Sequence, residues 1–273
     1  MPPRVTDDLD HVVDLVDAPA RVVSLVPSVT ELVCAFGCAD RLIAVTRYCT
    51  HPPDVVARLP KVGGTKNPDC AAIAALRPDV VLMNAEENRR EDAAELERLG
   101  VPIFTGFPRT VPEAARSIAA VGRLLGVAEI AARHAEAVDA ARTAALAAVR
   151  RRRQVFCPIW RKPWMTFNRD TFVHDLLACA GANNICADAT DRYPVIDLDA
   201  VARAEPDVIL LPDEPYHFRR RHLADLGALA ATPAWRDGRI HFVDGRALTW
   251  YGARTPAALE YFVGLLQSTG PAA

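Results

Sequence analysis

The amino-acid sequence predicts an α/β protein of two Rossmann-like lobes, each with a mainly parallel sheet. One long backbone α-helix is expected to join the lobes, with a ligand cleft between them. Apolar, β-branched runs alternate with helical patterns in both halves of the 273-residue chain, which is typical of parallel sheets covered by helices on both faces. An alanine-rich helical segment separates the two halves, and one pattern of about twenty residues occurs in each half.

The first lobe is predicted from strand-like runs with helical stretches between them. Ser28 stands three residues before Glu31, which is the signature of a capping box, so a strand is expected to pass directly into a helix. Further strands are expected at residues 40–46, 79–85 and 101–106, with helices at 69–77 and 89–100.

The centre of the chain is strongly helical and contains no glycine- or serine-rich linker. A helix is expected from Pro112, followed by a longer alanine-rich helix. About 23 residues at about 1.5 Å each would span ~35 Å, enough to cross from one lobe to the other. We therefore divide the chain into an N-terminal extension, a first lobe, linking helices and a second lobe, at residues 1–20, 21–111, 112–152 and 153–270.

A repeat supports this division. Residues 69–88 and 197–216 both read as an aspartate, a helix, Pro-Asp-Val, an apolar run and then a glutamate. The offset is 128 residues, and it aligns Glu86 with Glu214. Loops that follow parallel strands collect at one edge of the sheet, where open α/β sheets bind ligands.

Composition and charge narrow the classes of function. A formal net charge of -2 gives no reason to expect nucleic acid or an anionic membrane as partner. No apolar run approaches the ~20 residues of a membrane span. The seven cysteines form no disulfide framework, and residues 1–25 carry acids where a signal peptide has bases. We therefore expect a cytoplasmic monomer with reduced thiols.

The loops expected to face the cleft are rich in aromatic, basic and amide side chains. IWRKPWM, residues 159–165, holds two of the four tryptophans around one proline, which prevents a regular helix. Tryptophan and tyrosine suit a broad, ring-shaped ligand, and arginine suits phosphate or carboxylate groups. The candidate ligand contacts are Ser28, Arg47, Tyr48, Lys66, Asn67, Asn84, Phe107, Arg109, Trp160, Arg161, Lys162, Trp164, Tyr193, Tyr216, Trp250 and Tyr251.

Several long segments, in order, carry a resemblance over about residues 20–265. They are RVVSLVPSVTELVCAFGCADRLIAVTRYC, LPKVGGTKNPDCAAIAALRPDVVL, the long helix, and then WRKPWM, FVHDLLACAGANNI and RYP. The chain resembles the helical-backbone metal receptor superfamily, which has the class III periplasmic-binding-protein fold. Within it, the sequence is most similar to the cobalamin branch of the iron/vitamin B12 substrate-binding proteins of ABC importers.

This resemblance implies capture of cobalamin, or a related corrinoid or metal chelate, without catalysis. We expect no catalytic cofactor and name no metal-ligating residues. The resemblance also implies that one glutamate on each lobe docks onto arginines of a membrane permease, and the repeat assigns that role to Glu86 and Glu214. The relatives are periplasmic or attached to the cell surface.

Two other functions stay open. One is a cytosolic receptor for an iron-siderophore, haem or a free metal ion. Siderophores and haem are bound by the same fold, and a direct metal site is conceivable because His217 and His222 are close in sequence and His51 lies in a cleft loop. The weaker alternative is a Rossmann-type enzyme that uses a nucleotide. The sequence contains neither G-x-G-x-x-G after a strand nor a P-loop, and no nucleophile elbow for a hydrolase.

Overall fold

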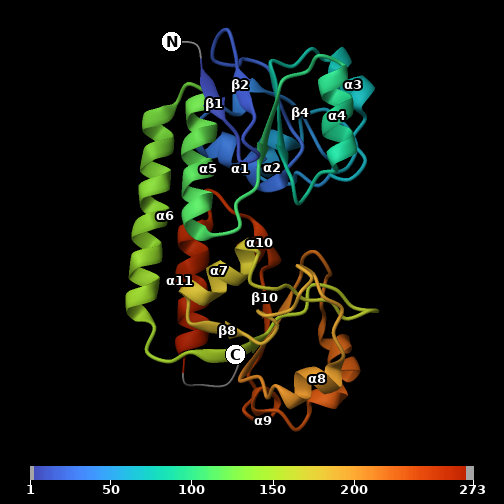
Figure 1. Ribbon diagram of the computed structural model, residues 1–273, viewed down its shortest axis with the longest axis vertical. Coiled ribbons are helices and arrows are strands. Elements are labelled where there is room, and N and C mark those ends of the chain that lie inside the picture. Colours follow the sequence, from blue (N-terminus) through green and yellow to red (C-terminus); the bar gives the residue numbers. More distant parts are fainter. Residues whose placement is uncertain (1–2, 269–273) are drawn as a thin grey trace. The chain divides into compact units, whose positions relative to one another are not determined.

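Each half of the chain builds a four-stranded parallel sheet (Figure 1). The computed structural model describes residues 3–268. The first sheet contains β3 (Val22–Ser24), β4 (Leu42–Val45), β5 (Val80–Asn84) and β6 (Ile103–Gly106), in the order β4-β3-β5-β6. The second contains β7 (Arg153–Phe156), β8 (Ala182–Asn184), β9 (Val208–Pro212) and β10 (Ile240–Val243), in the order β10-β9-β7-β8.

The two sheets have the same topology. In each, the first strand along the chain lies inside the sheet, with the second strand on one side and the third on the other. The offset of 128 residues carries β5 onto β9 and α3 (Cys70–Ala75) onto α8 (Leu198–Arg203) without a shift. The predicted repeat and the predicted fold of two parallel-sheet lobes are therefore confirmed.

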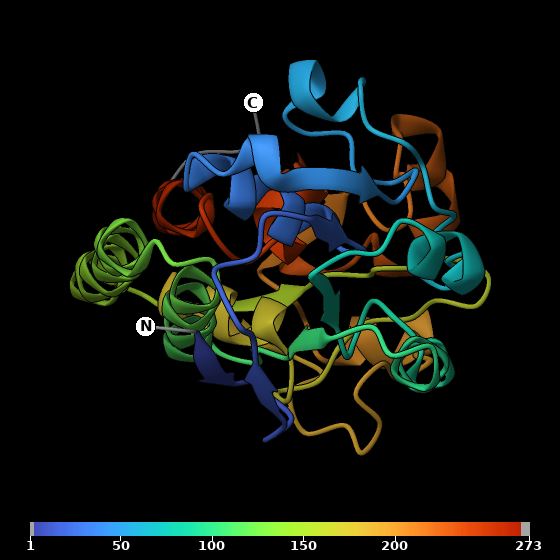
Figure 2. The ribbon, with the colours of Figure 1, turned by 90° about the horizontal axis from the view of Figure 1, so that it is seen from above.

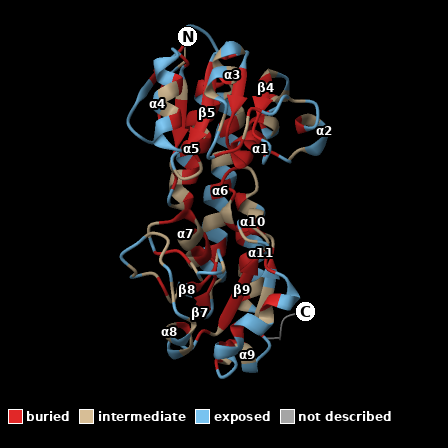
Figure 3. Ribbon diagram, turned by 90° about the vertical axis from the view of Figure 1, so that its right-hand side faces the viewer, coloured by how far each residue is buried: buried red, intermediate tan, exposed pale blue. Residues whose placement is uncertain are grey.

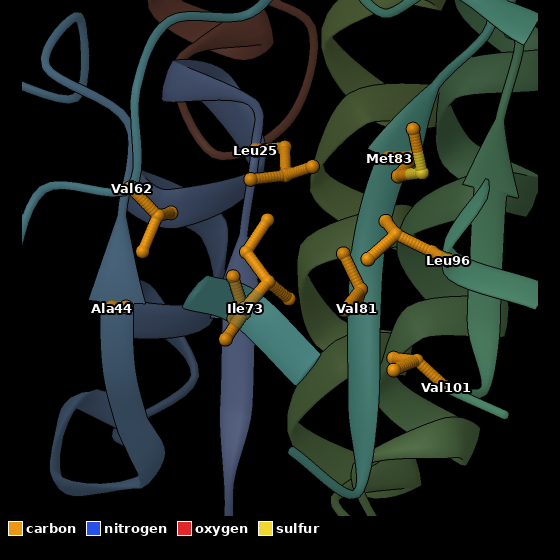
Figure 4. Close-up of a cluster of buried hydrophobic side chains, with 9 residues drawn as sticks. Leu25, Ala44, Val62, Ile73, Val81, Met83, Leu96 and Val101 are labelled. Atoms are coloured by element: carbon orange, nitrogen blue, oxygen red, sulfur yellow. The ribbon is translucent and has the colours of Figure 1, made fainter. Parts of the chain in front are cut away.

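Central strands are buried along their whole length, as β5 and β9 show (Figure 3). Val81 and Met83 project from the same face of β5, because alternate residues of a strand point to the same side. Ile73 of α3 and Leu96 of α4 (Arg90–Arg98) join the same apolar cluster (Figure 4). Both faces of β5 are covered, which explains its continuous run of apolar residues.

The first half of the chain contains further short elements. They are β1 (Arg4–Thr6), β2 (Val12–Asp14), α1 (Pro27–Ala35), η1 (Ala39–Arg41) and α2 (Pro53–Val56). Helix α1 begins at Pro27 with Val26 as its N-cap, without a side-chain cap. The predicted capping box of Ser28 and Glu31 is therefore wrong. Proline at the first helical position has its φ angle already set for the helix and has no N–H to cap.

The second half is completed by helices around its own apolar cluster. They are α7 (Phe172–Cys179), η2 (Arg220–Leu229), α9 (Pro233–Arg236), α10 (Gly245–Thr249) and α11 (Thr255–Gln267). Ile209 and Leu211 of β9 pack with Val201 of α8 and with Leu226 and Leu229 of η2.

The chain separates into two compact units by its contacts. The first unit takes the chain up to Pro108, then residues 112–137 and Tyr251–Ala253; the second takes Arg109–Val111, Val138–Trp250 and the described chain from Arg254. Helices α5 (Val111–Leu124) and α6 (Ala128–Ala148) fill the predicted linking segment. Residues 128–137 of α6 thus group with the first unit and residues 138–148 with the second.

These limits differ from the predicted ones, since α5 contacts the first unit instead of only linking the two. The N-terminal segment also belongs to the first unit. Its hairpin of β1 and β2 lies beside β6 (Figure 2), and the Asp7 and Asp8 carboxylates accept hydrogen bonds from the backbone N–H groups of Thr105 and Phe107, at 3.1 and 2.7 Å. No helix in the described part of the chain is both long and apolar enough to cross a membrane.

Candidate functional site

The loop after β4 contains an exposed tyrosine whose neighbours are linked by hydrogen bonds. Tyr48 is 54% exposed, and the Arg47 guanidinium carbon lies 5.5 Å from the centre of its ring. Arg47 also donates to the amide oxygen of Asn67 at 3.0 Å. The structure thus brings together three of the predicted ligand contacts.

Buried polar groups hold this loop in place. The Thr30 hydroxyl lies 3.2 Å from the Cys49 sulfur and donates to the Ser24 hydroxyl at 2.8 Å. Thr46 lies 3.2 Å from the same sulfur. Burial raises the pKa of the Cys49 thiol, which therefore stays neutral at pH 7. Arg47 and Tyr48 lie between Thr46 and Cys49, two members of this cluster. The sequence did not predict the cluster, because contacts among serine, threonine and cysteine side chains have no characteristic spacing.

The loop after β5 carries Glu86 and is fixed by two asparagines. The amide oxygen of Asn84 accepts from the backbone N–H groups of Glu86 and Glu87 at 2.8 and 3.0 Å. Asn88 donates to the carbonyl oxygens of Leu25 and Thr65 at 3.3 and 2.9 Å. Asn88 was not among the predicted site residues. Its position in the loop after a strand could have indicated a role at the site.

Four predicted ligand contacts of the first unit are buried in that unit or hydrogen-bonded to it. Asn84 and Tyr251 are buried and bond to each other at 2.8 Å, and Ser28 is buried in the first turn of α1. The Lys66 ammonium donates to the Glu86 carbonyl oxygen at 2.7 Å. The predicted ligand contacts Asn84, Tyr251 and Ser28 are thus buried within the first unit.

Phe107 and Arg109 follow β6. The Phe107 N–H is bonded to Asp8, as described above, and the side chain is half-buried. Arg109 groups with the second unit, where it pairs with Asp170 at 3.0 Å, and both side chains stay nearly half exposed.

A cavity of about 620 Å³ lies within the first unit, between β5, α4 and the N-terminal hairpin. Its lining includes Met83, Asn84, Asn88 and Arg90 but neither Arg47 nor Tyr48. This cavity therefore adjoins the Glu86 loop and is separate from the exposed tyrosine.

In the second unit, residues 159–165 form a tight hairpin. The backbone N–H of Ile159 donates to Met165 at 2.9 Å, and that of Met165 donates to Trp160 at 3.2 Å. Lys162 occupies the exposed turn with φ of +62° and a cis bond to Pro163. The prediction that this stretch is not helical is confirmed.

The two tryptophans of the hairpin have different surroundings. Trp160 is 43% exposed and meets the Tyr216 ring edge-on, with centroids 5.5 Å apart. Trp164 stacks on Phe218 at 5.9 Å and packs against the apolar cluster of the second unit. Of these two predicted ligand contacts, Trp160 is exposed, whereas Trp164 lies on the side of the turn that covers the cluster.

Arg161 and Trp250 are likewise used internally. Arg161 pairs with Asp225 at 2.8 Å and donates to the Tyr216 hydroxyl at 3.1 Å. Trp250 is only 6% exposed, and the Arg254 guanidinium carbon lies 5.0 Å from its ring centre. Tyr193 is half-buried with Arg192 against its ring at 5.7 Å. Of the predicted aromatic contacts in this unit, only Trp160 is largely exposed.

The two repeat-related glutamates are both partly exposed at strand ends. Burial raises the pKa of the Glu214 carboxyl; the positive charge of Arg246 and a hydrogen bond from the Trp250 side chain oppose this rise. Helix α10 begins so close to Glu214 that a Cβ at Gly245 would lie 2.5 Å from the Glu214 nitrogen.

The described residues contain no group of three or more His, Cys, Asp or Glu side chains that could hold a metal ion. His222 is buried; its Nδ1 lies 3.1 Å from the Arg219 backbone nitrogen and its Nε2 lies 3.2 Å from the Arg221 Nε. All seven cysteines, which lie within the described range, are free thiols.

Comparison with known proteins places the fold in a family. The family described as "Periplasmic binding protein" matches residues 22–247. A vitamin B12-binding protein of Pectobacterium atrosepticum is 30% identical over 207 residues, covering 71% of each chain. The periplasmic vitamin B12-binding protein BtuF of Vibrio cholerae superposes with a TM-score of 0.78 and 25% identity, over 92% of this chain and 97% of that one.

A haem-binding relative is equally similar in structure. The periplasmic haem-binding protein RhuT of Roseiflexus sp. RS-1 superposes with a TM-score of 0.79 and 27% identity, over 90% of this chain and 99% of that one. The prediction of a cytoplasmic protein is wrong, because the matching family and these relatives are periplasmic binding proteins. With a match over residues 22–247, two sheets of one topology and relatives aligned along most of the fold, this chain belongs to the periplasmic binding protein family.

Proposed function

We propose that this chain is the substrate-binding protein of an ABC importer and that it captures cobalamin or a related corrinoid. The observation that carries the proposal is the similarity to vitamin B12-binding proteins along most of the chain. The proposed binding is non-catalytic, since the chemistry of the site rests on aromatic contact and hydrogen bonding.

The exposed aromatic residues support the proposal that the ligand is large and flat. Tyr48 and Trp160 are large aromatic side chains that stay exposed, at 54% and 43%. Each stands on a backbone that is fixed by hydrogen bonds, so little conformational entropy is lost when it is covered. Large aromatic rings contribute strongly when buried against a macrocycle. We propose that Tyr48 and Trp160 are each available for contact with such a ligand.

Titration with cyanocobalamin tests this proposal. We expect 1:1 binding with a Kd below about 1 μM, or about 8 kcal/mol, measured by calorimetry and by quenching of tryptophan fluorescence. Tyr48→Ala and Trp160→Ala should each weaken binding, whereas Tyr261→Ala, at an exposed tyrosine on α11, should not. Absence of binding at 100 μM cyanocobalamin contradicts the proposal.

Haem is the second candidate, and Tyr48 favours it. A tyrosine phenolate is a known axial ligand of haem iron, and arginine pairs with carboxylates such as the haem propionates. Tyr48 is exposed beside Arg47. Haemin titration of the wild type and of Tyr48→Phe separates the ligands. If the protein binds haem, Tyr48→Phe should lose the charge-transfer absorption and at least tenfold in affinity for haemin. If it binds cobalamin, Tyr48→Phe should keep most of its affinity for cyanocobalamin, because the aromatic ring remains.

A further inference from the structure

We infer that the dipeptide Trp250–Tyr251 positions both glutamate loops, residues 85–88 after β5 and residues 213–215 after β9. The inference rests on the proposed function, which assigns Glu86 and Glu214 to permease docking. Each half of the dipeptide is argued below from contacts within one unit.

Tyr251 fixes the Glu86 loop through Asn84. The Asn84 amide oxygen must face the N–H groups of Glu86 and Glu87, since those groups can only donate. The Asn84 amide nitrogen is thereby directed to the Tyr251 hydroxyl, at 2.8 Å. Asn84 and Tyr251 are both buried, so this bond is shielded from water. Without the hydroxyl, the buried amide nitrogen loses its acceptor and Asn84 loses its fixed orientation.

Trp250 acts on the other loop. Its side chain hydrogen-bonds to the Glu214 carboxylate, and the indole N–H is the only donor that it has. The Trp250 backbone N–H donates to the Arg246 carbonyl at 2.9 Å, which ties the residue to the end of α10. The start of the same helix is in close approach to Glu214 at Gly245.

The two contacts are one peptide bond apart. Contacts group Trp250 with the second unit and Tyr251 with the first. Gly252 follows with φ of +121°, in a region open to glycine and strained for other residues. Each residue of the dipeptide therefore contacts the glutamate loop of its own unit.

Amide hydrogen exchange tests the first contact. Tyr251→Phe removes only the hydroxyl, and we expect at least threefold faster exchange at the N–H groups of Glu86 and Glu87. Exchange at Leu82, in the centre of β5, should stay within about 1.5-fold. Tyr261→Phe, an exposed tyrosine outside both loops, is the matched control. Asn84→Asp retains an acceptor for both N–H groups and can accept from the Tyr251 hydroxyl, so it should keep the slow exchange.

Unchanged exchange in Tyr251→Phe overturns the inference. So does an equal acceleration at Leu82, because it would indicate a general loss of stability. For the second contact, Trp250→Phe should raise the pKa of Glu214, followed by carboxyl-carbon NMR, because it removes a hydrogen bond to the charged form; an unchanged pKa overturns that half. These experiments need no ligand, so they fail or succeed independently of cobalamin binding and of permease docking.

Discussion

At the scale of single residues, the availability of an aromatic side chain depends on what packs beneath it. Trp160 and Trp164 stand four residues apart in one hairpin, yet Trp160 is exposed and Trp164 covers an apolar cluster. A proline-containing turn was enough to predict a break in helix structure. Which tryptophan faced the cluster depended on Phe218, more than fifty residues further along the chain.

The two tryptophans should therefore respond differently to alanine. Trp164→Ala should lower the free energy of unfolding by about 2–3 kcal/mol, somewhat less than for a fully buried aromatic residue. Trp160→Ala should leave urea unfolding nearly unchanged and weaken cyanocobalamin binding at least tenfold. Urea titration with parallel calorimetry measures both. Equal loss of stability in the two variants would contradict this assignment.

The Glu214 carboxyl is expected to make stability depend on pH. Its pKa is raised by burial, so the folded state holds the proton more tightly than the unfolded state does. The wild type should accordingly lose stability as pH rises from the unfolded pKa, about 4.3, through the folded one. Glu214→Gln should therefore raise the Tm at pH 7, and the gain should vanish below about pH 4.

Glu86→Gln, at the equivalent position of the repeat, is the control for loss of one negative charge at a strand end. A gain for Glu214→Gln that persists unchanged at pH 3.5 would show that desolvation of the carboxylate is not its cause.

At the scale of elements, helices α5 and α6 approach closely where a glycine meets an alanine. A Cβ at Gly122 of α5 would clash with the Cβ of Ala131 in α6. By contrast, a Cβ at Gly264 of α11 would meet no atom of the described residues within 4 Å, apart from its chain neighbours and the backbone of its own helix. The helix-forming composition predicted both helices, but the contact depends on which faces meet.

These two glycines give opposite predictions in urea unfolding. Gly122→Ala should destabilise by about 1–3 kcal/mol through overpacking. Gly264→Ala should stabilise by up to about 1 kcal/mol, because alanine has the higher helix propensity. Stabilisation by both substitutions would contradict the close approach of α5 and α6.

At the scale of the whole molecule, the repeat supplies two related docking candidates, one in each unit. Opposite charges in an interface determine encounter and register, and like charges oppose binding. Glu86 and Glu214 are at equivalent ends of β5 and β9. The proposed docking therefore requires both.

Charge reversal tests this requirement in cells that use this chain as their sole cobalamin-binding protein. Glu86→Arg and Glu214→Arg should each reduce uptake of radiolabelled cyanocobalamin at least tenfold, and the double variant should abolish it. Glu97→Arg and Glu260→Arg, at exposed sites on α4 and α11, are the matched controls. Uptake within twofold of wild type in the double variant would reject the docking role.

The sequence by itself determined the two parallel-sheet lobes, the long helix and the repeat that aligns Glu86 with Glu214. Local patterns suffice for these, because strand and helix periods and buried apolar runs are written in neighbouring residues. Only the tertiary structure decided which polar and aromatic side chains are used internally. Asn84 and Tyr251 are 167 residues apart and meet in one buried hydrogen bond, and burial depends on packing between distant segments, which no local pattern records.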